Sequence, residues 1–194
     1  MFDKLKVYCK NIVPLEEKEL QLIDSHFEVL NIKKKDFLLR EGKICNFLGF
    51  VEHGTIRHFH IKNGLEKTCD ISSEYSWVTD FQSFNQNKAG IMNLQALEDS
   101  TFFIVKKNNL RKLYSESKKY EPFGRIMAEK VAQRATEIAM SLSSDKPEER
   151  FQKLIESQTD LFQKVPQKYL ANFIGVSPES FSRIRKRIAE KSKS

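Results

Sequence analysis

The chain has too few cysteines for a disulfide framework and no stretch suited to a membrane. Only three cysteines occur, Cys9, Cys45 and Cys69, an odd number separated by wide gaps. We interpret them as reduced thiols of a cytoplasmic protein. The N-terminal MFDKLKVYCKN has no apolar run of the kind found in a signal peptide, and no window approaches the roughly 18 apolar residues of a membrane span. We therefore expect no membrane partner.

Features of catalytic sites are also missing. The seven glycines form no Gly-rich phosphate loop. No nucleophile lies in a recognisable constellation with a base, and no pair of carboxylates suggests acid–base chemistry. The sequence therefore predicts no catalytic residues, no metal and no cofactor, and we expect a protein that is not an enzyme.

What the chain does have is positive charge. Its 194 residues carry a formal net charge of +7, with a sequence pI of about 9.2. Such a balance favours an anionic partner, although ribosomal, membrane-surface and heparin-binding proteins share it. The hydrophobic fraction of 40% is sufficient for a substantial core.

The middle of the chain has the pattern of an antiparallel β-structure. From about residue 28 to residue 105, short strand-like runs are separated by turn signals. The clearest turn is Asn63-Gly64, which lies between the alternating runs TIRHFHI and LEKTCDI. Asn-Gly favours a two-residue hairpin because both positions tolerate a positive φ. Several such strands without intervening helices predict a roll, sandwich or barrel.

A long helix is predicted after the strands, over about 121–143. Its apolar positions recur at steps of four, four, three and four residues, which makes a narrow seam. The seam could pack on the β-structure of its own chain. We favour homodimerisation through this helix, because a two-fold pair would also duplicate whatever follows it. The seam consists of Met127, Val131, Ala135, Ile138 and Leu142.

The C-terminal segment 165–187, VPQKYLANFIGVSPESFSRIRKR, has the spacing of a helix-turn-helix. Counted from Gln167, the small Ala171 is fifth, Gly175 is ninth and Phe181 is fifteenth. A small residue is needed where the two helices cross, glycine can end the first helix with a positive φ, and the aromatic ring can fill the angle between the helices.

The second helix of this motif has its own start signal and a basic continuation. Ser177 is a suitable N-cap and Pro178 follows at the first helical position. From residue 183 to residue 194 there are six Lys or Arg and a single Glu. Residues 145–194 hold eleven Lys or Arg against seven Asp or Glu, a balance of +4. This composition suits phosphate contacts and a helix in a major groove.

The complete arrangement resembles the family of the cyclic-AMP receptor protein and Fnr. The stretches that carry the resemblance are FLLREG, FVEHG, EERF and, above all, LFQKVPQKYLANFIGVSPESFSRIRK. The resemblance implies an α+β fold with an N-terminal antiparallel β-roll sensor (1–118), a long dimerisation helix and linker (119–144), and a C-terminal helix-turn-helix domain (145–194). It implies a homodimeric transcription regulator that binds double-stranded DNA, with RNA polymerase and an unknown small-molecule effector as candidate partners. Because little sequence follows the second helix, we expect the family's wing hairpin to be shortened or absent.

The resemblance assigns DNA-contacting roles to particular residues. Arg183 is the candidate for bidentate recognition of guanine, and Glu179 can accept from cytosine N4. Pro178 stands where some members carry a base-reading arginine, so part of that code is altered. The predicted DNA-binding residues are Gln167, Lys168, Ser177, Glu179, Ser180, Arg183, Lys186 and Arg187.

The sensor departs from the cyclic-nucleotide pattern. The family's Gly-Glu pair corresponds to Thr79 and Asp80, and the position of its phosphate-binding arginine falls near Gly90, with no arginine there. We therefore predict that the protein does not bind cyclic AMP. The candidate ligand segment remains Thr79, Asp80, Phe81, Gln82 and Ser83. The three scattered cysteines cannot reproduce the four-cysteine iron–sulfur site of Fnr-like members.

Two other functions remain open. His58, His60 and Glu66 form a possible metal triad, so a metal-dependent, cupin-like β-barrel enzyme or ligand-binding protein is an alternative. The glycine spacing of a cupin is absent, however, and no histidine follows His60. The other alternative is an interaction module whose basic tail binds acidic protein or RNA.

Overall fold

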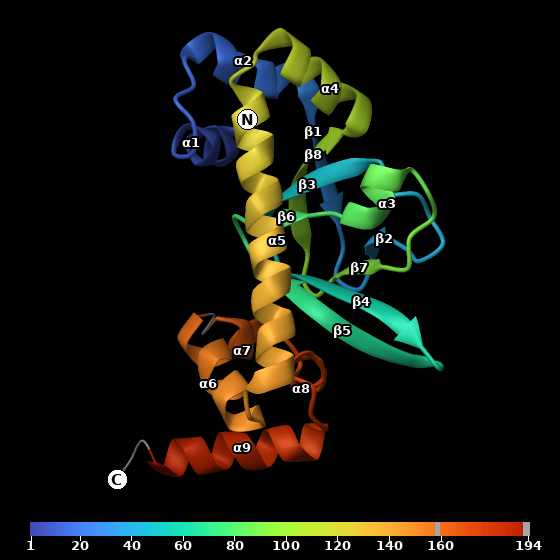
Figure 1. Cartoon of the computed structure of the whole chain (residues 1–194), viewed down its shortest axis with the longest axis vertical. Helices are drawn as coiled ribbons and strands as arrows, with labels where there is room; N and C mark the ends of the chain where they lie inside the picture. Colours follow the sequence, from blue (N-terminus) through green and yellow to red (C-terminus); the bar gives the residue numbers. More distant parts are fainter. Residues whose placement is uncertain (158–159, 192–194) are drawn as a thin grey trace.

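The computed structural model describes residues 1–157 and 160–191 and consists of a β-roll, a long helix and a small helical domain (Figure 1). The helices are α1 (Asp3–Lys10), α2 (Glu17–His26), α3 (Phe81–Gln86), α4 (Lys107–Glu116), α5 (Tyr120–Ser144), α6 (Pro147–Ser157), α7 (Leu161–Lys164), α8 (Gln167–Phe173) and α9 (Pro178–Lys191). The strands are β1 (Phe27–Ile32), β2 (Phe37–Leu39), β3 (Phe47–His53), β4 (Ile56–Lys62), β5 (Leu65–Ser72), β6 (Trp77–Val78), β7 (Asn93–Ala96) and β8 (Ser100–Lys106).

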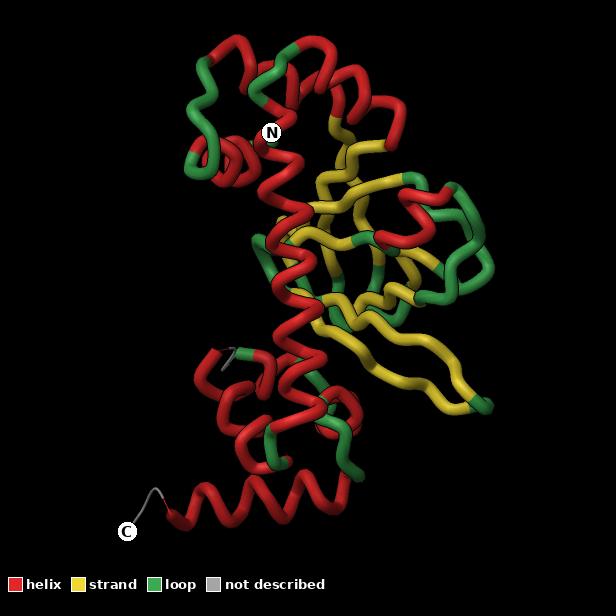
Figure 2. Tube along the Cα trace, viewed as in Figure 1, coloured by secondary structure: helices red, strands yellow, loops and turns green. Residues whose placement is uncertain are grey.

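The roll consists of two four-stranded antiparallel sheets, with strand orders β1-β8-β3-β6 and β2-β7-β4-β5. Figure 2 shows the β4–β5 hairpin projecting from the second sheet. Its turn is the predicted one, because Asn63 and Gly64 have φ values of 54° and 73°. The predicted antiparallel roll is confirmed.

Strand β8 explains how the roll is joined to the helices around it. Its run of Phe102, Phe103, Ile104 and Val105 is buried throughout. Phe102 and Ile104 belong to the core between the two sheets, whereas Phe103 and Val105 belong to the core beneath the helices. Successive side chains of a strand point to opposite faces, so a continuous apolar run indicates a strand covered on both sides.

The helical layer is built from α1, α2, α4 and the beginning of α5. Helix α2 starts with a capping box in which the backbone N–H of Glu16 donates to the Glu19 carboxylate at 2.7 Å. The hydroxyl of buried Tyr120 donates to the Glu19 carbonyl oxygen at 2.8 Å and so ties the start of α5 to α2.

Only the first turns of α5 are buried. Tyr120 and Phe123 lie in the core, and Met127 is half-buried, with its sulfur 3.6 Å from the Tyr8 hydroxyl. Further along, Val131 and Leu142 are exposed. At a rise of about 1.5 Å per residue, the 25 residues of α5 span roughly 37 Å. Within the described ranges, no helix is both long enough and apolar enough to cross a membrane.

The C-terminal helices enclose a core of their own. Phe151 and Phe181 are fully buried, and their ring centroids lie 5.0 Å apart. The roll contributes to the same core, since Ile71 of β5 and Leu97 are members of this cluster. The helical domain is therefore packed against the roll as well as connected to it through α5.

Candidate nucleic-acid interface

Helices α8 and α9 form the helix-turn-helix that the spacing predicts. Ala171 is fully buried, and the backbone N–H of Val176 donates to its carbonyl oxygen at 2.9 Å. Gly175 has a φ of 75°, and its N–H donates to the Asn172 carbonyl oxygen at 3.1 Å. A side chain at this φ would be strained, which accounts for the glycine.

The first turn of α9 is held by serine hydroxyls. Ser177 is the N-cap, and its hydroxyl oxygen accepts from the backbone N–H of Ser180 at 3.2 Å. The Ser180 hydroxyl in turn accepts from the guanidinium of Arg183 at 3.2 Å. This chain of contacts pre-orients Arg183, the predicted guanine-reading residue, at the surface of the helix.

The predicted contact residues share the outer surface of the motif. Gln167 and Lys168 are exposed at the start of α8, and Glu179, Arg183 and Lys186 are exposed on α9. Helix α9 lies at the end of the molecule farthest from α1, α2 and α4 (Figure 1). The pKa of Glu179 is lowered, first by the backbone N–H of Glu179 itself and then by the Ser177 hydroxyl. The Glu179 carboxylate is therefore a charged acceptor at neutral pH.

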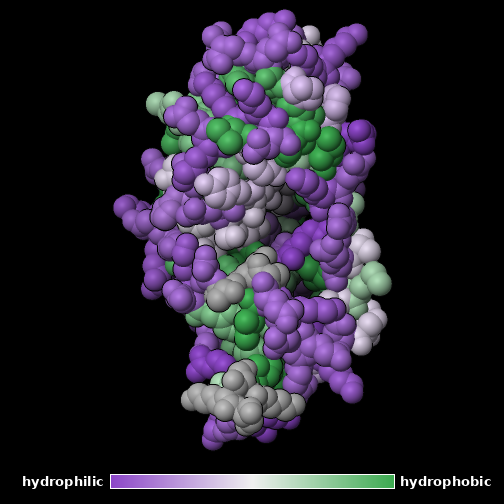
Figure 3. Space-filling model, turned by 90° about the vertical axis from the view of Figure 1, so that its left-hand side faces the viewer, coloured by the Kyte–Doolittle hydropathy of each residue, from purple (hydrophilic) through white to green (hydrophobic). Residues whose placement is uncertain are grey.

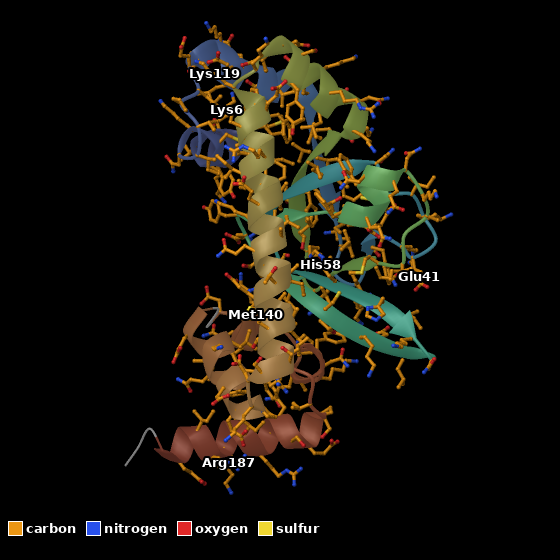
Figure 4. The ribbon with its side chains drawn as sticks, in the orientation of Figure 1. Lys6, Glu41, His58, Lys119, Met140 and Arg187 are labelled. Carbon is orange, nitrogen blue, oxygen red and sulfur yellow. The ribbon has the colours of Figure 1, made fainter. Side chains whose placement is uncertain are left out.

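Two arginines of α9 have contacts that the sequence did not indicate. Arg187 points back toward α6, where its Nη2 lies 2.5 Å from Oε1 of Glu148, and Figure 4 shows its place on α9. Arg185, which was not in the predicted set, lies against Gln167, and its guanidinium can donate to the amide oxygen of that residue. A pairing 39 positions along the chain, as for Arg187 and Glu148, leaves no local sequence signal.

The five residues of the predicted ligand segment face different surroundings. Thr79 and Phe81 line a largely apolar cavity of about 270 Å³ between α3, α4 and α5. Asp80 is instead the N-cap of α3, with Oδ1 accepting from the Ser83 N–H at 3.0 Å. The Ser83 hydroxyl donates to the Lys88 carbonyl oxygen at 2.5 Å, and Gln82 is exposed.

Asp80 also determines what can stand at position 90. A Cβ at Gly90 would lie 2.0 Å from Asp80 Oδ2, so no larger residue fits there without movement. This oxygen is buried and, in the part of the chain that the structure describes, has no hydrogen-bond partner. Lys88 is exposed on the loop after α3.

The alternative metal triad does not converge. The His58 Nε2 lies 2.9 Å from the Ser72 hydroxyl, whereas the Glu66 carboxylate accepts from Arg57 at 2.5 Å. Glu66 is paired across the hairpin with Ile61, and His60 with Lys67. Cross-strand partners share a face, so Glu66 and His60 lie on opposite faces. Over residues 1–157 and 160–191, no cluster of three His, Cys, Asp or Glu side chains is placed to hold a metal ion.

The cysteines are shielded thiols. Burial raises the pKa of Cys9 to about 12 and that of Cys69 to about 11. Because the thiolate is the reactive form, neither group is activated at neutral pH.

Comparison with known proteins agrees with this geometry. Residues 29–117 match the family model of the cyclic nucleotide-binding domain. Among solved structures, the chain is similar to FixK2 from Bradyrhizobium japonicum, with a TM-score of 0.74, 12% identity, and 86% of each chain covered. It is also similar to a CooA mutant from Carboxydothermus hydrogenoformans, with a TM-score of 0.70, 15% identity, and coverage of 88% of this chain and 79% of that one.

A third similar structure covers a larger share of this chain. It is a putative transcriptional regulator of the Crp/Fnr family from Eubacterium rectale, with a TM-score of 0.67, 15% identity, and coverage of 93% of this chain and 88% of that chain. The chain has the Crp/Fnr fold. Comparison with the curated proteins gives no match. The predicted fold class is thus confirmed.

Proposed function

We propose that this protein is a homodimeric, sequence-specific DNA-binding transcription regulator of the Crp/Fnr type. The observation that carries the proposal is the exposed face of the helix-turn-helix, where Arg183 is pre-oriented by Ser180 and lies beside charged Glu179. A bidentate donor and a carboxylate acceptor on one helix can distinguish guanine and cytosine in the major groove. Gln167 and Lys168, which are exposed at the start of α8, would contact phosphates.

The proposed dimer uses the uncovered part of α5. Val131 is 36% exposed and Leu142 is 48% exposed, and their spacing along the chain puts both on one face of α5. Figure 3 shows hydrophobic surface open to solvent at several heights on the side of the molecule that faces left in Figure 1. In a dimer, the 131–142 segments of the two copies would pack on each other and cover this face in both. The dimer would then present two recognition helices to a near-palindromic site.

We also propose that the protein does not respond to cyclic AMP. Asp80 places a buried carboxylate against Gly90, the position that would have to supply the cation for a cyclic phosphate. A carboxylate without a cationic partner repels a phosphate group instead of binding it. Titration calorimetry with cyclic AMP should give no heat of binding, and micromolar affinity would overturn this proposal.

The DNA-binding proposal is tested by fluorescence anisotropy with duplexes from the protein's own upstream region. The wild-type protein should bind one duplex specifically in the presence of excess non-specific DNA. Arg183→Ala should lose at least about 1 kcal/mol of discrimination, since one bidentate base contact contributes roughly 1–3 kcal/mol. Sedimentation velocity should show an unchanged dimer.

Arg111→Ala is the matched control. It removes the same charge from an exposed position on α4, at the opposite end of the molecule from α9. It should bind DNA as the wild type does. Equal losses for Arg111→Ala and Arg183→Ala would show that net charge, and not the assigned reading face, governs binding. Equal affinity for RNA or acidic protein would favour the interaction module instead.

A further inference from the structure

Arg57 of β4 is an arginine whose side chain is almost completely buried. It is 1% exposed, although it carries a permanent charge. Its Nε donates to the Thr68 hydroxyl at 2.8 Å, and its Nη1 donates to the Glu66 carboxylate at 2.5 Å. A buried charge is stable only when it is paired and hydrogen-bonded. This side chain is therefore fixed by the surrounding β4–β5 hairpin.

The guanidinium also connects two parts of the molecule. Its central carbon lies 4.2 Å from the ring centroid of Phe59 on β4 and 3.9 Å from that of Tyr169 on α8. The guanidinium of Arg57 thus contacts one ring of the roll and one ring of the helix-turn-helix. Such cation–π contacts are strongest where water is excluded.

A second contact lies beside the first. The side-chain oxygen of Asn172 accepts from the backbone N–H of Thr68. Tyr169 and Asn172 are three residues apart, so they occupy the same face of α8. Strand β5 is an edge strand, and Asn172 satisfies one of its free N–H groups. We call the set Arg57, Phe59, Thr68, Tyr169 and Asn172 the clasp.

The hairpin holds α5 as well. In β5, Thr68 pairs with Phe59 and Asp70 with His58, which leaves Cys69 as a bulge between them. Asp70 accepts from Arg134 of α5 at 2.9 Å. One short segment of β5 is therefore attached to α8 on one side of the bulge and to α5 on the other.

The clasp leaves the reading face free. Gln167 and Lys168 on α8, and Glu179 and Arg183 on α9, remain exposed while Tyr169 and Asn172 face the roll. The clasp therefore orients the helix-turn-helix without covering it. Without the clasp, the orientation would depend on the chain between α5 and α6, the apolar contacts of Ile71 and Leu97, and the ion pair between Lys164 and Glu98.

We propose that Arg57 is a positioning residue for DNA recognition, which holds α8 on the β4–β5 hairpin and so sets the separation of the two recognition helices in a dimer. This inference rests on the proposed function. Half-sites read by paired helices lie about 34–36 Å apart, one turn of DNA. Two loosely tethered readers would engage them with a lower effective concentration.

The test uses the full chain in three variants. Arg57→Met removes the charge and keeps an apolar side chain, Tyr169→Ala removes the ring, and Tyr169→Phe is the control that keeps the ring. The probes are duplexes with the operator found in the upstream region, with zero to four base pairs added between its half-sites. Arg57→Met and Tyr169→Ala should bind the natural spacing at least about tenfold more weakly and lose the preference among spacings. Tyr169→Phe should behave as wild type.

Hydrogen exchange without DNA is the second readout. In Arg57→Met and Tyr169→Ala, peptides covering 66–72 and 166–174 should exchange faster, whereas β8 peptides should not change. If these two variants exchange faster but keep the wild-type affinity and spacing preference, the positioning role is refuted. Equal impairment of Tyr169→Phe and Tyr169→Ala would refute it too. If the wild-type protein binds no operator, the proposed function fails, and exchange alone decides whether Arg57 holds α8 on the roll.

Discussion

At the residue scale, the ion pair between Arg187 and Glu148 limits one of the basic side chains near the reading face. Glu148→Gln should release Arg187 to a phosphate and remove a negative charge from the groove beside α9. We expect affinity for DNA to rise by about two- to fivefold at low salt. One additional phosphate contact steepens the dependence of log K on log salt by about 0.9. Anisotropy titrations at several salt concentrations measure both effects.

Glu137→Gln is the matched control for this substitution. Glu137 is exposed on α5, where its carboxylate accepts from Gln133 at 2.8 Å. The same charge is removed there without releasing an arginine of α9. An equal rise in affinity for Glu137→Gln would mean that net charge alone explains the effect.

A second residue-scale prediction concerns His58, whose position beside α5 is marked in Figure 4. Burial lowers its pKa, Asp70 opposes that shift, and Arg134 adds to it. In the unfolded chain, His58 is protonated at about pH 6.5, whereas in the folded chain it is protonated only at a lower pH. The stabilisation from neutral His58 is complete above about pH 6.5 and is lost as the pH falls toward the folded pKa.

Urea unfolding between pH 7.5 and pH 5 should show a fall in the free energy of unfolding of up to about 1.4 kcal/mol per pH unit from this group. His58→Gln should flatten the profile. The control is His53→Gln, which removes an exposed imidazole instead of the buried one; its profile should keep the fall seen in the wild type. An identical slope in wild type and His58→Gln would rule out His58 as the titrating group.

At the element scale, the local elements were largely predictable and their mutual contacts were not. Asn63-Gly64 specified the hairpin, and the seam from Met127 to Leu142 specified α5, because both signals depend on residues that are near in sequence. The residue pairing between β4 and β5 was not predictable in the same way. Glu66 pairs with Ile61, which places it on the face of Arg57 and away from the two histidines.

The candidate site shows the same division. The cap at Ser177 and the exposed Arg183 followed from the motif. Burial of Arg57 did not, because an arginine in an alternating strand is usually expected to face solvent. Its stabilising ring, Tyr169, lies more than one hundred positions away on another domain. Only packing in three dimensions brings the two together.

The element-scale prediction concerns α5. Ala135→Lys should place a charge in the exposed seam and convert the proposed dimer to a monomer at micromolar concentration, because an unpaired buried charge costs several kcal/mol. Gln133→Lys adds the same side chain about 200° away around the helix and should leave the dimer intact. Sedimentation velocity distinguishes the outcomes. If both variants are dimers, or both are monomers, the dimer face assigned to α5 is wrong.

At the scale of the whole molecule, the roll and the helix-turn-helix share a core, so they should not respond independently to mutation. Ile71 and Ile56 are both buried β-strand isoleucines, but Ile71 packs with the C-terminal helices and Ile56 packs inside the roll. Replacement of a buried isoleucine by alanine costs about 2–5 kcal/mol. The region of the molecule that loosens should therefore differ between Ile71→Ala and Ile56→Ala.

Hydrogen exchange of the full chain tests this difference. In Ile71→Ala, peptides of α8 and α9 should exchange faster than in wild type, although they lie about one hundred residues away in the sequence. In Ile56→Ala, faster exchange should be concentrated in β4, β7 and their neighbours, because its cavity lies between the two sheets. If Ile71→Ala leaves α8 and α9 unchanged, the apolar contact of Ile71 does not support them. If it loosens them, the roll supports the helix-turn-helix directly, and any signal that moves β5 can reach it without passing along α5.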